Sequence, residues 1–134
     1  MANTTFSGPV RSENGFEQVS KNTTTGVFTT SATYNATITG GVQSLSGAGA
    51  VDLTNLVTEL TTTGANALTL ADGTTSGQIK IVNMIVDGGD GTLTPTTFAN
   101  GTTITFDAVA ESVTLVWNST IGWVATSTVG ATIA

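Results

Sequence analysis

The most constraining feature of this chain is its near absence of charge. Only 9% of its 134 residues are Asp, Glu, Lys or Arg, against about 25% in ordinary soluble domains. Their place is taken by 30 threonines, 16 glycines and many asparagines and serines. Threonine is β-branched and suits a pleated strand, whereas glycine and asparagine supply turns. The chain is therefore expected to fold as an all-β protein with many short strands.

The same composition predicts a nearly neutral surface. The net charge is −6, and the cations are Arg11, Lys21 and Lys80. A surface with few charges favours association, so we expect much of it to be covered by other copies or by a partner. A monomer with a threonine-rich exterior is the alternative, because threonine and asparagine hydrate well.

Several functional classes are excluded by what the sequence lacks. Without cysteine or histidine there is no disulfide framework, thiol catalysis or Cys/His zinc site. Three cations are too few for a nucleic-acid footprint, and no run of 18 apolar residues could span a membrane. No secretory signal is visible at the N-terminus. We expect no cofactor, no nucleic-acid partner and no membrane partner.

The charge distribution divides the chain. Four charged residues lie within the first 21 positions, and residues 22–51 carry none. Residues 1–25 hold isolated apolar side chains and turn signals, so they are expected to form an extended arm with one small hairpin at most. Such an arm cannot build its own core, so it must dock on another surface or remain disordered. We predict an arm and connector over residues 1–45, with attachment through Phe6, Val10, Arg11 and Phe16.

Residues 46–134 are predicted to form an antiparallel β-sandwich of the jelly-roll kind, or a small barrel. Segment 77–86 (GQIKIVNMIV) is nearly continuous in apolar residues, which is typical of a central strand. Segment 51–60 is expected to be a strand, with one helical turn capped by Asp52 as the alternative. Asn100-Gly101 predicts a two-residue hairpin turn, and residues 118–122 predict a second hairpin. Pro95 suggests an edge or irregular strand.

The carboxylates offer only weak motifs. Asp87-Gly88-Gly89-Asp90-Gly91 begins like a calcium-binding repeat, but it occurs once, and such repeats work by stacking. A turn is the better interpretation. The residues Asp87, Asp90, Asp107 and Glu111 could form a glycosidase pair only with a specific separation. Because histidine and cysteine are absent, we expect no enzymatic activity.

Two tryptophans and one lysine are the remaining candidates. Trp117 and Trp123 bracket a tight hairpin, where exposed rings could stack on sugars. Core or subunit-interface packing is favoured, because Val113, Leu115 and Trp117 share one strand face. Lys80 either pairs with a carboxylate across a subunit boundary or faces solvent and blunts sheet pairing. We assign Trp117, Trp123 and Lys80 to the core or an interface.

Several of these segments resemble the β-domain of tailed-phage virion structural proteins, which include capsid decoration (cement) proteins and fibre-like modules. The segments are Thr63–Gly73, Gly77–Ile81, Val113–Asn118 and Gly122–Val124. The opening, Thr5–Ser12 with Gly15-Phe16, resembles the start of small virion proteins of marine phages and cyanophages.

This resemblance implies a non-enzymatic structural role, often as a trimer. We expect a homotrimer on the surface of a phage particle that binds the major capsid protein or another virion protein and stabilises the head. One alternative is a fibre or tail-associated adhesion module that binds host surface glycans. Another is a secreted carbohydrate-binding β-sandwich.

Overall fold

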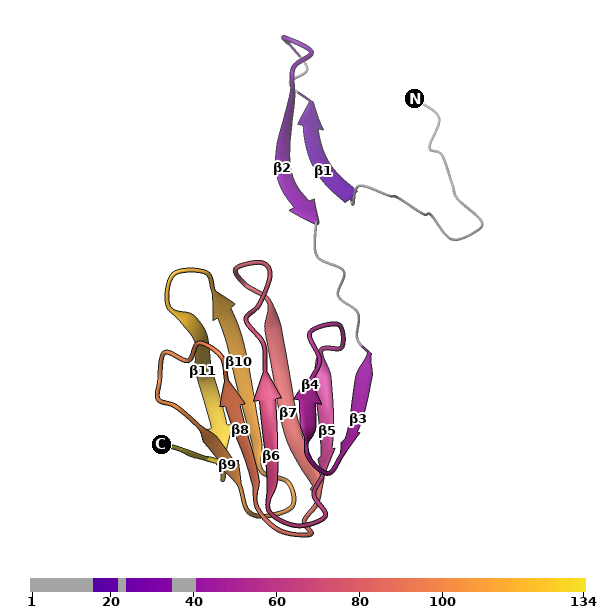
Figure 1. The fold of residues 1–134 in the computed structure, drawn as a ribbon. Helices are drawn as coiled ribbons and strands as arrows, with labels where there is room; N and C mark the ends of the chain where they lie inside the picture. The colour runs from indigo at the N-terminus through magenta and orange to yellow at the C-terminus, as the bar shows by residue number, and fades with distance from the viewer. Residues whose placement is uncertain (1–15, 22–23, 35–40) are drawn as a thin grey trace, which may run out of the picture. The chain divides into compact units, whose positions relative to one another are not determined.

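The computed structural model describes residues 16–21, 24–34 and 41–134, and within them every regular element is a β-strand. The chain divides into two compact units, Met1–Ile38 and Thr39–Ala134. In the first unit, β1 (Phe16–Lys21) and β2 (Phe28–Tyr34) pair antiparallel as a hairpin (Figure 1). A register shift falls between Gln18 and Val19.

Residues 41–134 form two five-stranded sheets that pack face to face (Figure 1). Sheet I has the order β11-β10-β7-β5-β3, and sheet II has the order β12-β9-β8-β6-β4. The strands are β3 (Val42–Ser46), β4 (Gly49–Val51), β5 (Val57–Thr61), β6 (Asn66–Leu70), β7 (Ile79–Val86), β8 (Gly91–Pro95), β9 (Ile104–Phe106), β10 (Ser112–Asn118), β11 (Gly122–Val129) and β12 (Thr132–Ile133).

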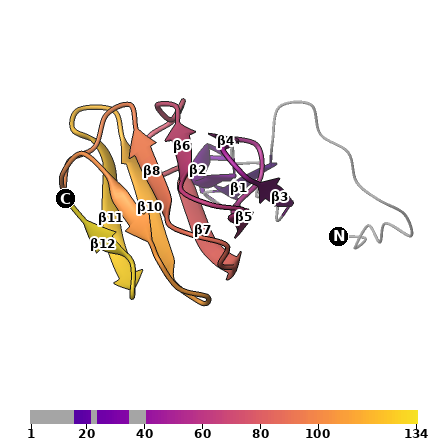
Figure 2. The same cartoon turned by 60° about the horizontal axis from the view of Figure 1, so that its bottom comes forward.

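The first six strands of this unit are wound as three coils. The chain changes sheets at every connection from β3 to β8, so that β3, β5 and β7 lie in sheet I and β4, β6 and β8 lie in sheet II. Neighbours within each set are parallel, with Val42 opposite Val57 and Val57 opposite Ile81 in sheet I. In Figure 2 the two layers can be followed from β3 and β4 towards β11 and β12. Each crossover between parallel strands thus runs through the opposite sheet instead of through a helix.

The last four strands extend the two sheets beyond β7 and β8. In sheet I, β10 pairs antiparallel with both β7 and β11; in sheet II, β9 pairs antiparallel with β8 and β12. The turn at residues 119–121 joins β10 to β11 and sets Trp117 opposite Trp123. A bulge between Thr114 and Leu115 shifts the register along this hairpin.

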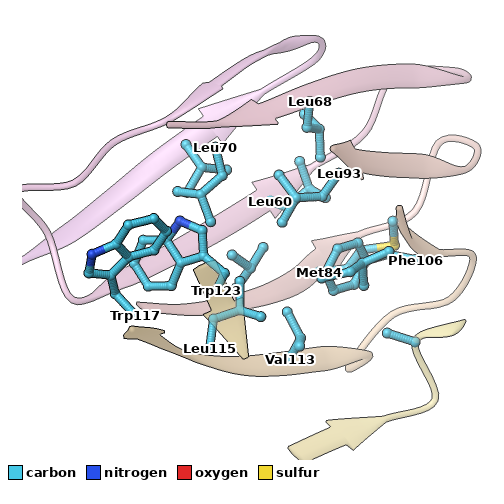
Figure 3. Close-up of a cluster of buried hydrophobic side chains, with 14 residues drawn as sticks. Leu60, Leu68, Leu70, Met84, Leu93, Phe106, Val113, Leu115, Trp117 and Trp123 are labelled. Atoms are coloured by element: carbon cyan, nitrogen blue, oxygen red, sulfur yellow. The ribbon is translucent and has the colours of Figure 1, made fainter. Parts of the chain in front are cut away.

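The core lies between the two sheets because every second side chain of a strand points inward. In β10 the inward positions are Val113, Leu115 and Trp117, and the intervening positions are more exposed. Figure 3 shows the core side chains. The largest fully buried hydrophobic side chains of the core come from strands of both sheets: Leu60, Leu68, Leu70, Val82, Met84, Leu93, Ile104, Phe106, Val113, Leu115 and Trp123.

These findings confirm the predicted all-β class and the two-layer sandwich. The central position of segment 79–86 is also confirmed, as is the hairpin at residues 118–122. The predicted antiparallel pairing holds for four pairs: β7 with β10, β10 with β11, β8 with β9, and β9 with β12. The pairs among β3 to β8 are parallel. Strand β3 crosses the predicted boundary between residues 45 and 46 and belongs to sheet I.

Three local predictions were wrong. Segment 51–60 is neither one strand nor a helical turn, because residues 52–56 form a loop between β4 and β5. Asn100-Gly101 is not a two-residue turn: eight residues, 96–103, join β8 to β9, and the Asn100 Oδ1 atom accepts a hydrogen bond from the Ala125 amide (2.8 Å). Pro95 ends the middle strand of sheet II, where its missing N–H costs least.

Candidate functional site

The two tryptophans form a buried pair at one end of the sandwich. Their ring centroids lie 5.4 Å apart with an interplanar angle of 60°. Trp123 is 0% exposed and Trp117 is 7% exposed. The indole Nε1 of Trp123 donates a hydrogen bond to the Ala71 carbonyl oxygen (2.9 Å), and a Cβ atom on Gly73 would collide with the Trp117 ring. Figure 3 shows both rings among the core leucines. Neither ring offers a free face for stacking on a sugar.

Lys80 lies inside the sandwich, so it does not face solvent, and the carboxylate beside it belongs to its own chain. Its side chain is 1% exposed. The Nζ atom donates to the Asn55 carbonyl oxygen (2.8 Å) and lies 3.5 Å from Oδ1 of Asp52 in the same chain. The reason is strand alternation: Ile79 and Ile81 point outward, so the lysine between them must point inward. Its in-phase neighbour Val82 in the core could have revealed this orientation.

The partner of Lys80 is a carboxylate that organises loop 52–56. Asp52 accepts hydrogen bonds from the backbone N–H groups of Thr54 (3.1 Å) and Asn55 (2.8 Å), and from the Asn55 side-chain amide (2.6 Å). Gln43 holds the start of the loop, because its Oε1 accepts from the Asp52 amide (2.9 Å) and from the Thr58 hydroxyl (2.8 Å). The sequence suggested Asp52 only as the cap of a helical turn, which does not form, and it did not predict this network.

Burial and hydrogen bonding act in opposite directions on these two groups. Burial raises the pKa of the Asp52 carboxyl, but the Asn55 hydrogen bonds and the Lys80 charge outweigh it and hold that pKa below its usual value of 3.8. Burial lowers the pKa of the Lys80 ammonium, and the Asp52 charge offsets this only in part. An ionised, multiply hydrogen-bonded carboxylate is a poor electrophile and a weak base. The network fits a structural role, which is to fasten loop 52–56 to β7.

Three other carboxylates accept hydrogen bonds in turns or loops. Asp87 Oδ1 accepts from the Gly89 amide (2.9 Å) within the turn that joins β7 to β8. Glu111 Oε2 accepts from the Asp107 amide (2.7 Å) in the turn before β10. Asp72 accepts from the Thr97 hydroxyl (3.1 Å). Among the described residues, no three His, Cys, Asp or Glu side chains gather closely enough to hold a metal ion.

The outer face of sheet I carries a band of apolar side chains among polar ones. Its polar outward positions are Ser44, Ser46, Glu59, Thr61, Asn83, Ser112 and Thr114. Six outward-pointing, β-branched side chains run across all five strands, and they are absent from the core cluster. Val42 is 51% exposed and Ile79 is 46% exposed. Among the outward positions of these five strands, only Glu59 is charged. We call this surface the apolar face and define it as Val42, Val57, Ile79, Ile81, Val116 and Val124.

The outer face of sheet II is built from hydroxyls. Its outward positions alternate with core residues such as Leu68, Leu93 and Ile104. They carry neither a charge nor a large apolar side chain. We call this surface the threonine face and define it as Thr69, Thr92, Thr94, Thr105 and Thr132 with Ala50 and Ala67.

The predicted attachment residues fall at the edge of what the structure describes. Phe6, Val10 and Arg11 lie outside the described residues, and Phe16 is the first residue of β1. Their role therefore stays a prediction.

No protein-family model matches this chain, and no curated protein matches it. The described part of the chain contains no helix that is long and apolar enough to cross a bilayer.

Proposed function

We propose that this chain is a non-enzymatic virion structural protein, a capsid decoration protein that binds and stabilises a phage head as a homotrimer. Its partners are other copies of itself and the major capsid protein or another virion protein. It acts at the surface of the particle.

The observation that carries this proposal is the pair of broad, uncharged outer faces on a well-packed sandwich. Apart from Glu59, the outward positions of both sheets are uncharged, with apolar, hydroxyl or amide side chains. Such faces can be covered by neighbouring subunits without stripping water from charged groups, which is the main cost of burying polar surfaces. A shell protein needs many equivalent contacts of this kind.

Four carboxylates and Lys80 add support by being engaged within the fold: the carboxylates are those of Asp52, Asp72, Asp87 and Glu111. Lys80 and Asp52 pair with each other, while Glu111 holds the turn before β10. Both indoles lie in the core, so these two rings offer no exposed surface for stacking on a glycan. A scaffold whose polar groups serve its own loops is suited to assembly.

The N-terminal residues supply attachment in this proposal. An arm that carries Phe6, Val10, Arg11 and Phe16 would tether each subunit to the shell, and three arms on one trimer raise the effective concentration of each. Binding to the assembled shell but not to its separated subunits shifts the equilibrium towards the intact head. Closed three-fold symmetry limits further growth of the oligomer.

The test is to locate the protein on particles of the phage that encodes it. Cryo-electron microscopy should show three-fold density on the head, and an antibody against residues 41–134 should label the head surface. Density or label confined to the tail or its fibres would overturn the assignment as a decoration protein. Absence from purified particles would overturn the virion role as a whole.

A truncation separates attachment from folding. A chain that lacks residues 2–20 should remain an oligomer in solution and fail to bind particles stripped of the native protein. Full occupancy by the truncated chain would contradict the role of the arm. The full-length chain, added at the same concentration, is the control for particle integrity.

A further inference from the structure

The two outer faces of the sandwich differ in a way that a monomer does not require. Both belong to sheets of similar size in one fold, yet six valines and isoleucines stand among the polar side chains of one face, whereas the other carries threonine and alanine. If both faces met water, both would be expected to carry polar side chains, as the threonine face does. The contrast indicates that the apolar face is covered in the functional molecule and the threonine face is not.

We propose that the apolar face is the subunit interface, and that it packs against the same face of other copies of this chain around a three-fold axis. This inference rests on the proposed homotrimer and names the surface that forms it. The partner must match a surface with one charge, Glu59, and no cation among its outward positions. A heterologous partner chosen by charge has little to recognise there, whereas the same apolar face on another copy matches it in polarity.

The dimensions of the face suit a three-fold arrangement. Five strands spaced about 4.8 Å apart make a face about 24 Å wide, and three such faces form a triangle whose centre lies about 7 Å from each side. Side chains between packed sheets fill about 5 Å on each side, so the middle strand needs the longest side chains. Strand β7 is the middle strand of sheet I and carries Ile79 and Ile81, whereas its neighbours carry Val57 and Val116.

The area suggests a reversible assembly. A face about 24 Å wide and five residues long covers about 400 Å² in projection. This is about half of the roughly 800 Å² that each partner buries in a standard interface, so the contact between subunits is expected to be weak. We therefore expect a trimer at micromolar concentrations that dissociates on dilution.

Sedimentation equilibrium of the full chain tests the proposal. The wild type should have a mass of three times 13.5 kDa at high micromolar concentration. Ile81→Lys should reduce this mass to 13.5 kDa, which corresponds to a dissociation constant raised by roughly 100-fold or more by a buried, unpaired charge. The matched control is Thr94→Lys, which places the same side chain on the middle strand of sheet II and should leave the trimer intact.

A second variant covers the case in which Ile81→Lys fails to fold. Ile81→Thr combined with Val116→Thr keeps β-branched residues in both strands and removes the apolar contact. Emission from the buried tryptophans reports whether each variant is folded.

Four results would overturn the interface. They are a wild type that sediments as a monomer or a dimer at high micromolar concentration, a trimer that survives in the folded Ile81→Lys chain, a trimer that survives the double threonine change, and equal disruption by Thr94→Lys. The proposed function fails separately. A trimer that Ile81→Lys breaks but that is absent from phage particles would leave the interface standing and remove the virion role. A monomer that still decorates heads would do the reverse.

Discussion

Removing the carboxylate of Asp52 should destabilise the sandwich far more than its position in a loop suggests. Asp52→Ala deletes the acceptor for the Thr54 and Asn55 amides and for the Asn55 side chain. It also leaves Lys80, which is 1% exposed, without its counter-ion. A buried group that loses its charged partner carries its desolvation cost uncompensated.

The magnitude follows from these contacts. The lost hydrogen bonds to an ionised acceptor account for about 2 kcal/mol, and the isolated ammonium adds about 1–2 kcal/mol because it keeps its bond to the Asn55 carbonyl. The total loss in unfolding free energy is about 3–4 kcal/mol. Lys80→Met removes the ion pair between Lys80 and Asp52 and fills the same space with apolar atoms. It should therefore lower the unfolding free energy by no more than about 1 kcal/mol.

Urea denaturation followed by tryptophan emission measures the stability of Asp52→Ala, Lys80→Met and the double variant, because both indoles are buried in the folded state. In the Lys80→Met background, Asp52→Ala should cost only about 2 kcal/mol, since no cation is left unpaired. The difference of about 1–2 kcal/mol is the coupling between the two side chains. An Asp52→Ala cost below about 1 kcal/mol, or equal costs in the two backgrounds, would refute this reasoning.

Three further predictions follow from the core and from Asp52. Trp123→Phe should lower the free energy of unfolding by about 3 kcal/mol in urea titrations, because it opens a cavity and leaves the Ala71 carbonyl without its indole donor; an unchanged midpoint would contradict this. Gly73→Ala should cost about 1–3 kcal/mol, seen as a lower melting temperature, because its Cβ would overlap the Trp117 ring; an equal or higher melting temperature would show that the loop relaxes freely. Because the folded pKa of Asp52 is held below 3.8, its charge contributes stability that is fully present well above pH 3.8 and is lost as the pH falls through the folded value. The urea midpoints of wild type and Asp52→Asn should therefore converge in acid, and a gap that stays constant down to the lowest pH would contradict the assignment.

The sequence predicted those parts of the fold that depend on neighbouring residues, namely strand alternation and short turns. Alternation placed Val113, Leu115 and Trp117 on one face, and the short turn after β10 followed from its residues. The parallel pairing could not be read in this way. Val57 lies opposite Ile81, 24 positions later in the chain, with a strand of the other sheet between them. Turn residues predict pairing between strands that follow each other directly, and not between strands this far apart in the sequence.

The candidate site shows the same limit. In β7 both sides of the strand carry apolar residues, so the alternation left the orientation of Lys80 open between a solvent-facing position and one in the core or at an interface. The position of β7 in the middle of sheet I, with Val82 and Met84 buried, resolves the orientation. Only then do Ile79 and Ile81 stand out as an uncovered surface.

The winding of β3 to β8 restricts how such a molecule can change in length. An insertion of one strand between β5 and β7 would displace β7 into the opposite layer and separate it from β5, its parallel partner in sheet I. An insertion of two strands would add a complete turn and leave the tryptophan-filled end untouched. Connections can vary more freely, since equivalent positions in sheet I are 15 residues apart in one turn, Val42 to Val57, and 24 in the next, Val57 to Ile81. Duplication of a whole turn is therefore the change that lengthens both layers and the apolar face together.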